Sequence, residues 1–186
     1  MSSAQLIVVT GLPATGKSTL ARELARMLRA PLVGKDMIKE PLLDVLGAGD
    51  DAHSRLLSTA SFAILFAVAR DLLACGPRVI VEGNFRPGEH ERPLLQALPP
   101  GPEAAAAIVQ VLCRVEESER IARLQLRARD PGRHAGHRDA ARMPAADSGG
   151  FLELPGRRIE LDSHHSGPSP AALAESLLPE VNLRTV

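Results

Sequence analysis

Apolar and polar positions along the chain alternate between two periods, beginning with residues 5–10. This run, QLIVVT, is short, apolar and rich in β-branched residues, which is typical of a strand buried in a parallel sheet. From Lys17 onward the apolar residues recur every three or four positions, as Leu20, Leu24 and Leu28 do, with charged residues between them. The pattern therefore predicts a buried strand that is followed, after a short loop, by an amphipathic helix.

The same alternation of strand-like and helix-like segments continues to residue 178. Further strands are predicted at Pro31–Lys35, Arg78–Glu82, Ala106–Cys113 and, within residues 151–162, Arg158–Leu161. Further helices are predicted at Met37–Leu46, from Asp50 or Asp51 to about Cys75, at Pro93–Leu98, from Glu116 to about Arg129, and from Ser169-Pro170 to Leu178. Residues 62–69 are apolar all round, so the long helix is expected to be covered on most sides. This order indicates the α/β class, with one domain over residues 1–186 and a parallel sheet covered on both faces.

The loop between the first strand and the first helix carries the strongest motif, G-x-x-x-x-G-K-[ST], matched at every fixed position. Its glycines let backbone N–H groups turn toward a phosphate, and the helix start adds unpaired donors and the positive end of its dipole. Lys17 is expected to reach the β- and γ-phosphates of ATP, and the Ser18 hydroxyl to ligate Mg²⁺. The residues predicted to bind the nucleotide here are Gly11, Leu12, Pro13, Ala14, Thr15, Gly16, Lys17, Ser18 and Thr19.

Two carboxylates follow other predicted strands and should lie at the same sheet edge as this loop. Asp36, after the second strand, is predicted to orient an acceptor hydroxyl and take its proton, or else to cap the helix that follows. Glu82, at the end of the third strand, could hold Mg²⁺ in the manner of a Walker B carboxylate, or be an ordinary polar strand end. Asn84 is a weaker candidate for a substrate contact.

Arginines gather after the fourth strand, and a segment without apolar periodicity follows them at residues 130–150. The arginines are Arg120, Arg123, Arg127, Arg129, Arg133 and Arg138. The arginines and the segment that follows them could form a lid, at about residues 128–150, that closes over the γ-phosphate and becomes ordered when both substrates bind. Alternatively, the arginines could be a solvated face. His134 and His137 could contact a phosphate or substrate, hold a metal, or be exposed loop residues.

Composition narrows the choice of partner. The 22 basic and 22 acidic residues cancel, so no overall field draws the protein to nucleic acid or membrane, and the lack of Trp and Tyr disfavours a base-stacking surface. Cys75 and Cys113 are isolated, which predicts free buried thiols in a reducing compartment. No leader is recognised and the longest strictly apolar run, residues 62–69, is too short to span a bilayer, so a cytoplasmic protein is expected.

Four motifs together resemble a known family. They are the Gly11–Thr19 loop, Lys35-Asp36 with Ile38-Lys39-Glu40, the run Val79–Phe85 that contains Glu82, and Arg123-x3-Arg127 leading into residues 133–137. The chain resembles the small P-loop kinases related to nucleoside monophosphate kinases, especially the group with the polynucleotide kinase domain, chloramphenicol phosphotransferase and zeta toxin.

The resemblance implies a P-loop NTPase three-layer sandwich with a five-stranded parallel sheet of order 2-3-1-4-5, and ATP as the phosphoryl donor. It also implies that Asp36 is the acceptor-side base, that Arg123 and Arg127 are catalytic lid arginines, and that Arg133 contacts the nucleotide. Glu82 departs from the family pattern, because many relatives carry Asp at this position.

The leading hypothesis is an ATP- and Mg²⁺-dependent kinase that phosphorylates a hydroxyl of a small molecule, such as a nucleoside, sugar or antibiotic. A polynucleotide 5′-hydroxyl kinase and a nucleotide-binding regulatory ATPase without an acceptor are the alternatives. Acceptor contacts are expected between about residues 37 and 66, where no code identifies the acceptor. The sequence does not indicate an oligomeric state.

Overall fold

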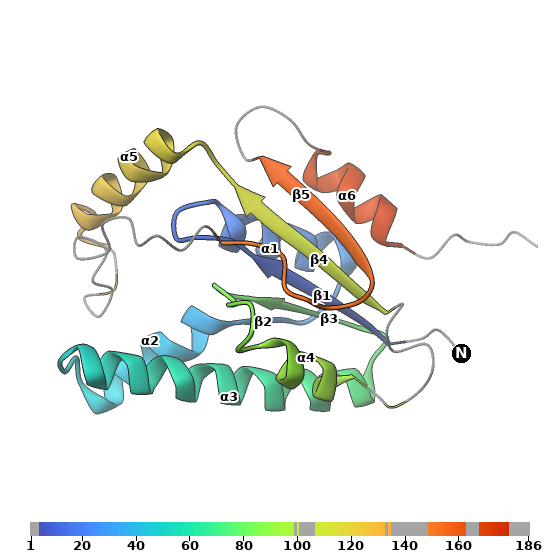
Figure 1. Ribbon diagram of the computed structural model, residues 1–186, viewed down its shortest axis with the longest axis horizontal. Helices are drawn as coiled ribbons and strands as arrows, with labels where there is room; N and C mark the ends of the chain where they lie inside the picture. The colour runs from blue at the N-terminus through green and yellow to red at the C-terminus, as the bar shows by residue number, and fades with distance from the viewer. Residues whose placement is uncertain are drawn as a thin grey trace, which may run out of the picture.

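The computed structural model describes residues 4–98, 100, 107–132, 134, 149–162 and 168–178, and shows a five-stranded parallel sheet of order β2-β3-β1-β4-β5 (Figure 1). The strands are β1 (Gln5–Thr10), β2 (Leu32–Gly34), β3 (Arg78–Glu82), β4 (Ile108–Arg114) and β5 (Arg157–Asp162). The helices are α1 (Lys17–Leu28), α2 (Lys35–Leu46), α3 (Asp51–Cys75), α4 (Glu91–Ala97), α5 (Glu117–Ala128) and α6 (Pro170–Leu177). The predicted fold class and strand order are confirmed.

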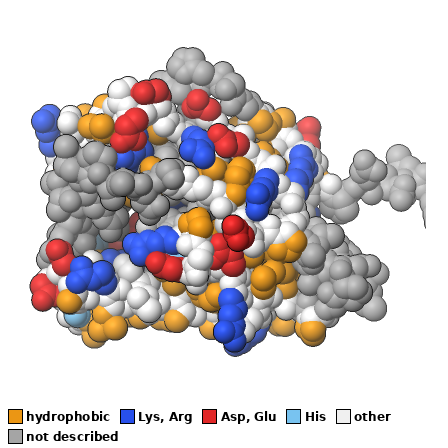
Figure 2. All heavy atoms as spheres, viewed as in Figure 1, with side chains coloured by type: hydrophobic (Ala, Val, Ile, Leu, Met, Phe, Trp, Pro, Cys, Tyr) orange, Lys and Arg blue, Asp and Glu red, His pale blue; other side chains and the backbone are white. Residues whose placement is uncertain are grey.

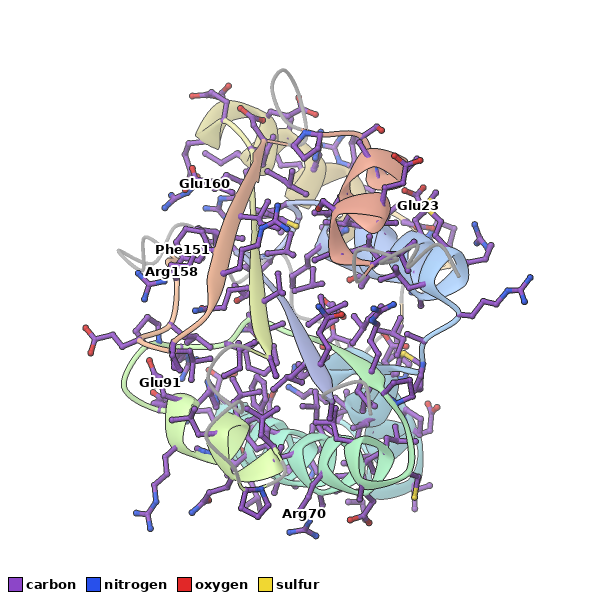
Figure 3. The ribbon with its side chains drawn as sticks, turned by 90° about the vertical axis from the view of Figure 1, so that its right-hand side faces the viewer. Glu23, Arg70, Glu91, Phe151, Arg158 and Glu160 are labelled. Atoms are coloured by element: carbon purple, nitrogen blue, oxygen red, sulfur yellow. The ribbon has the colours of Figure 1, made fainter. Side chains whose placement is uncertain are left out.

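The central strand β1 supplies side chains to both faces of the sheet. Leu6 and Val8 belong to the core formed with α3 and α4, whereas Ile7 and Val9 belong to the core formed with α1 and α6. This division follows from the two-residue period of a strand, in which successive side chains point to opposite faces. Figures 1 and 3 show the resulting three layers, with α2, α3 and α4 on one side of the sheet and α1 and α6 on the other.

The long helix α3 was predicted to be covered on most sides, and this prediction is wrong. Leu65 is fully buried, but Ile64 and Val68 on the outer side are each 40% exposed. By length and composition alone α3 could cross a membrane, and a third of its most apolar stretch is buried. Its buried side chains pack on the sheet and on Leu94 of α4, as those of a core helix in a globular fold do.

The second strand is shorter than predicted, and α2 begins at Lys35 rather than Met37. Gly34 is the N-cap of α2, and Asp36 lies within the first turn of the helix, after the cap position. The alternative role of Asp36 as a helix cap is therefore wrong. Asp50 and Ser169 do cap α3 and α6, accepting hydrogen bonds from the backbone N–H groups of His53 and Ala172.

The two cysteines are free, as predicted, but only one of them is buried. Cys113 lies inside β4, where burial raises the pKa of its thiol to about 12. This thiol is therefore protonated at neutral pH and serves as an apolar packing group. Cys75, at the end of α3, is exposed, so the prediction of two buried thiols is correct for Cys113 alone.

Candidate functional site

The loop between β1 and α1 has a backbone that few residue types can adopt. Gly11 has a φ of +146° and Gly16 a φ of +86°, both in the region that favours glycine. A Cβ atom on Gly11 would lie 2.4 Å from the backbone oxygen of Cys113 on β4, so any side chain there would displace the loop. Ala14, with a φ of +70°, adopts a left-handed conformation that is uncommon for a residue with a Cβ. The loop ends on the N-terminus of α1, as a phosphate-binding loop requires.

A cavity of about 170 Å³, here called the phosphate cavity, adjoins this loop at the C-terminal edge of the sheet. Its lining includes predicted site residues from four separate segments of the chain: Lys17, Ser18, Thr19, Asp36, Glu82 and Arg127. The pairing of Val9 on β1 with Glu82 on β3 brings that carboxylate beside the loop. The fold thus assembles predicted site residues that are up to 110 positions apart (17 to 127) in the chain.

Three of these side chains form a contact group inside the phosphate cavity. The Ser18 hydroxyl donates to Oε1 of Glu82 at 3.1 Å, and Nζ of Lys17 lies 3.9 Å from the same oxygen. Burial raises the pKa of Glu82 and lowers the pKa of Lys17, while each opposite charge partly counters the shift of the other. Burial in the free site therefore disfavours the charged forms of both groups, and bound phosphates and a metal ion would offset this cost.

The oxygens of Ser18 and Glu82 fit the preference of Mg²⁺ for hydroxyl, carboxylate, phosphate and water ligands. In the part of the chain that the structure describes, no three His, Cys, Asp or Glu side chains gather as a metal site. Mg²⁺ held at Ser18 and Glu82 would thus need phosphate oxygens or water to complete its shell. This is the usual way in which Mg²⁺ binds in nucleotide sites.

Asp36 faces the phosphate cavity from the first turn of α2. Its Oδ1 lies 2.9 Å from Nζ of Lys35, and the Asp36 side chain is 42% exposed, whereas that of Lys35 is 6% exposed. A carboxylate in the first turn of a helix is also favoured by the helix dipole. Asp36 is therefore fixed in direction while one side of it stays open to a ligand.

The arginines of α5 have three different surroundings, although their helical spacing suggested one face. Arg127 lines the phosphate cavity. Arg123 donates to the Ala14 oxygen of the loop at 3.5 Å and to Glu119 at 2.8 Å, so it contacts the loop backbone.

Arg120 is buried and makes two hydrogen bonds of 2.7 Å to Glu117 within its own helix. Of the lid proposed at about residues 128–150, the residues Arg133, His137 and Arg138 lie outside the described part of the chain. His134 is described, and its Nε2 lies 2.9 Å from Oδ1 of Asp44 on α2.

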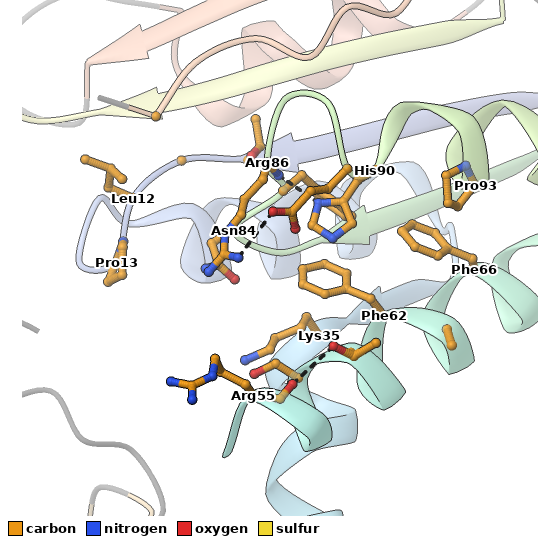
Figure 4. Close-up of a pocket in the computed structure, with 18 of the residues that line it drawn as sticks. Leu12, Pro13, Lys35, Arg55, Phe62, Phe66, Asn84, Arg86, His90 and Pro93 are labelled. Atoms are coloured by element: carbon orange, nitrogen blue, oxygen red, sulfur yellow. Dashed lines mark hydrogen bonds and ion pairs between the residues drawn. The ribbon is translucent and has the colours of Figure 1, made fainter. Parts of the chain in front are cut away.

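A second and larger cavity, of about 760 Å³, lies between the loop and helices α3 and α4 (Figure 4). We call it the acceptor cavity. It shares Pro13, Lys35 and Asn84 with the phosphate cavity, so the two adjoin. Contacts were expected between residues 37 and 66, and residues of α3 such as Ser54 and Phe62 do line this cavity, whereas those of α2 beyond Lys35 do not.

Part of this wall comes from the segment between β3 and α4, which the sequence did not predict. Arg86, Glu89 and His90 line the acceptor cavity, whereas the sequence predicted a substrate contact only for Asn84 of this segment. One usable signal was the clustering of aromatic residues, because Phe62, Phe66 and Phe85 are three of only four Phe in a chain without Trp or Tyr. All three rings surround His90.

His90 is held as a neutral ring in this aromatic group. Its centroid lies 4.2 Å from that of Phe62, and its Nδ1 accepts a hydrogen bond of 2.8 Å from the backbone N–H of Arg86 (Figure 4). Burial among these rings lowers the pKa of His90 below the ordinary value of 6.5. Protonation at Nδ1 would also remove the bond that holds the backbone of Arg86.

This arrangement predicts a loss of stability in mild acid. As the pH falls below 6.5, the unfolded chain takes up a proton at His90 before the folded protein does, so the free energy of unfolding decreases. His90→Asn, which keeps an acceptor but cannot titrate, should be less stable than wild type by about 1–2 kcal/mol at pH 8, and this gap should narrow between pH 6.5 and 5. Urea unfolding across this pH range measures the gap. Leu94→Ala on α4, an apolar truncation, should show a constant gap, and equal behaviour of both variants would refute the prediction.

Comparisons with known proteins agree with this geometry. The sequence model of the AAA domain family matches residues 6–146. No curated protein sequence matches the chain. A candidate kinase from Chloroflexus aurantiacus J-10-fl has a similar structure, with 29% identity, a TM-score of 0.81, and coverage of 94% of this chain and 97% of that one.

More distant structures share the fold alone. The APS kinase of Mycobacterium tuberculosis, solved with AMPPNP and APS, has 18% identity and a TM-score of 0.55, covering 95% of this chain and 96% of its own. A sugar kinase from Janibacter sp. HTCC2649 has 17% identity and a TM-score of 0.58, and the match covers 93% of this chain and 91% of that one. The chain belongs to the AAA domain family and has the fold and phosphate-binding loop of the small P-loop kinases related to nucleoside monophosphate kinases.

Proposed function

We propose that the protein is an ATP- and Mg²⁺-dependent kinase that transfers the γ-phosphoryl group to a hydroxyl of a small molecule. The observation that carries the proposal is the pair of adjoining cavities, which share the wall formed by Pro13, Lys35 and Asn84. One cavity has the cation, hydroxyl and carboxylates that nucleotide phosphates and Mg²⁺ require. The other is of a volume suited to a small organic molecule.

The proposed reaction gives each described side chain a defined task. The acceptor oxygen forms a bond to the γ-phosphorus, the bond from that phosphorus to the bridging oxygen of the β-phosphate breaks, and the electron pair leaves with ADP. Asp36 takes the hydroxyl proton, and Lys17 and Arg127 neutralise charge on the phosphoryl oxygens. Ser18 and Glu82 would hold Mg²⁺, which supplies further charge neutralisation when bound. Arg123 keeps the loop in place through the Ala14 oxygen.

The positions of these groups favour transfer over simple hydrolysis. Asp36 lines the phosphate cavity next to Lys35, and Lys35 lines both cavities, so the carboxylate lies near the boundary that an acceptor hydroxyl must approach. A regulatory ATPase has no need of a second cavity at this boundary. A polynucleotide kinase needs a continuous basic surface, but basic and acidic side chains are interspersed on the face shown in Figure 2.

Product analysis tests the proposed function. The protein is incubated with Mg²⁺ and γ-labelled ATP, first with a pool of small metabolites and then with a 5′-hydroxyl oligonucleotide. A labelled small product, with a mass gain of one phosphate, is the expected result. Labelled oligonucleotide would support the polynucleotide kinase instead, and release of inorganic phosphate alone would support the regulatory ATPase.

A further inference from the structure

The acceptor cavity has two ends of different chemical character, and Figure 4 shows both. The polar groups of Lys35, Arg55 and Arg86 lie toward Pro13 and the phosphate-binding loop. Phe66 and Pro93 lie at the opposite end. A ligand that fills the cavity therefore meets cationic side chains next to the transferred phosphate and apolar side chains farther away.

The apolar end is built from stacked and tilted rings. Phe62 and Phe66 are stacked with their centroids 6.0 Å apart and an angle of 19° between their planes, and Phe85 and His90 pack against them. Because His90 is held neutral in this group, the end carries no charge of its own. Such a surface suits a planar ring or a branched apolar group of the ligand.

The cationic end has more positive than negative side chains among the described lining residues. Lys35, Arg55, Arg86 and Arg120 line the cavity, against the single carboxylate of Glu89. Three of the four cations already face a carboxylate: Lys35 faces Asp36 at 2.9 Å, Arg86 faces Glu89 at 3.5 Å, and Arg120 faces Glu117 at 2.7 Å.

The remaining cation, Arg55, is exposed, and its guanidinium makes no ion pair or hydrogen bond within the part of the chain that the structure describes. It is thus the basic group in this wall that is available to a ligand. On α3, Arg55 directly follows Ser54, which also lines the cavity.

The Ser54 hydroxyl next to Arg55 adds a further hydrogen-bond donor, and the contacts around it leave that donor available. Lys39, which is 2% exposed on α2, donates from Nζ to the hydroxyls of Ser54 and Ser58, each at 2.9 Å. Ser58 in turn donates to the backbone oxygen of Ser54 at 3.1 Å. The Ser54 oxygen already accepts from Lys39, so this hydroxyl meets a ligand chiefly as a donor.

This wall suits an anion better than a neutral polyol. Sugar hydroxyls both donate and accept, so their recognition requires acceptors in the wall. The described lining residues include neutral acceptors, such as the Asn84 amide and the Thr59 hydroxyl, but the one carboxylate is that of Glu89, and it already pairs with Arg86. A carboxylate or phosphate, in contrast, accepts only, and its charge is stabilised by the guanidinium of Arg55.

We propose that the phosphoryl acceptor is an anionic alcohol: a small molecule that carries a carboxylate or phosphate beside the reacting hydroxyl and a planar or branched apolar body. Arg55 and the Ser54 hydroxyl bind the anionic group, and the body lies on Phe62 and Phe66. The inference rests on the proposed function, since it describes the substrate of that reaction. It narrows the acceptor from any small molecule with a hydroxyl to an anionic one.

Binding of simple aryl probes tests the inference without requiring turnover. The full-length protein is saturated with AMPPNP and Mg²⁺, so that the phosphate cavity is filled, and is titrated calorimetrically with phenyl phosphate, benzoate and benzyl alcohol. The first two probes distinguish phosphate from carboxylate recognition, and the third has the ring without the charge. We expect at least one anionic probe to bind about ten- to a hundredfold more tightly than benzyl alcohol, the range for a charged hydrogen bond.

Variants then assign the preference to Arg55. Arg55→Met should remove the preference for the anionic probe, and Arg55→Lys should restore part of it. Arg70→Met is the matched control, because Arg70 lies on the same helix, points away from the sheet (Figure 3) and is 61% exposed outside the cavity. This control should keep the wild-type preference.

Three results would overturn the inference. These are equal binding of benzyl alcohol, no saturable binding of any probe, and an unchanged anion preference in Arg55→Met. Failure of the proposed function has a different signature, because product analysis would then give inorganic phosphate alone with every acceptor. Labelling of a neutral sugar or nucleoside in preference to its anionic counterpart would preserve the kinase and refute the anionic acceptor.

Discussion

Lys17→Ala should lower the rate of phosphoryl transfer by about a hundred- to a thousandfold or more, because the phosphates lose a fixed cation as negative charge develops in the transition state. The ammonium group of Lys17 lies 3.9 Å from Oε1 of Glu82 and 3.4 Å from the Leu12 oxygen, and Lys17 lines the phosphate cavity. Its removal leaves the buried carboxylate of Glu82 without its nearest cation, which should raise the pKa of Glu82 further. Steady-state turnover at saturating ATP measures the effect.

The side chain of Lys17 is only 12% exposed, so its removal also changes a buried part of the structure. The variant should nevertheless fold, because the neutral form of Glu82 is accessible and no apolar core contact is removed. Circular dichroism and thermal unfolding check this point. Arg26→Ala, an exposed change on the same helix α1, serves as the control and should keep wild-type turnover. Full phosphoryl transfer by Lys17→Ala would refute the role of the loop.

Asp36→Asn should lower phosphoryl transfer about 10²- to 10⁴-fold, the range of general-base contributions, while the affinity for ATP stays nearly unchanged. Asn keeps the size of the side chain and an oxygen that can accept from Nζ of Lys35, at the place where Asp36 accepts at 2.9 Å. It cannot take up the acceptor proton. Since Asp36 does not cap α2, the change should alter the free energy of unfolding by less than about 1 kcal/mol.

The measurement for Asp36→Asn combines turnover at saturating acceptor with calorimetric binding of ATP. Asp71→Asn on α3, an exposed carboxylate outside both cavities, is the matched control. If the proton leaves late in the reaction, orientation matters more than basicity and the decrease falls at the lower end of the range. Turnover close to wild type would remove Asp36 from the mechanism.

The sequence predicted the helices and strands of this fold well, because the apolar positions in them recur with a clear period. The β-branched run of β1 and the capping residues Asp50 and Ser169 are local signals, and the structure places them as expected. The strand order came from the family resemblance, since no local pattern specifies which parallel strands become neighbours. The start of α2 was misplaced because Gly34 and Lys35 fit a strand end and a helix start equally well.

The candidate site was predictable only in part, for a physical reason. The loop, Asp36 and Glu82 follow strands, and the common edge of a parallel sheet brings such positions together. Arg120 shares a helical spacing with Arg127, yet its local pairing with Glu117 within α5 determines where its side chain lies. Arg86 and His90 belong to an irregular segment, where nothing in the spacing indicates which cavity they will line.

The wall shared by the two cavities bears on inhibitor chemistry. Because Pro13, Lys35 and Asn84 belong to both cavities, a compound that joins an aryl group to a nucleotide polyphosphate through a short linker could occupy both at once. Tethering makes the second contact intramolecular, with an effective concentration of about millimolar for a short flexible linker. Such a bisubstrate compound would discriminate this enzyme from other nucleotide-binding proteins through its aryl half, since the phosphate-binding loop alone is a feature that many of them have.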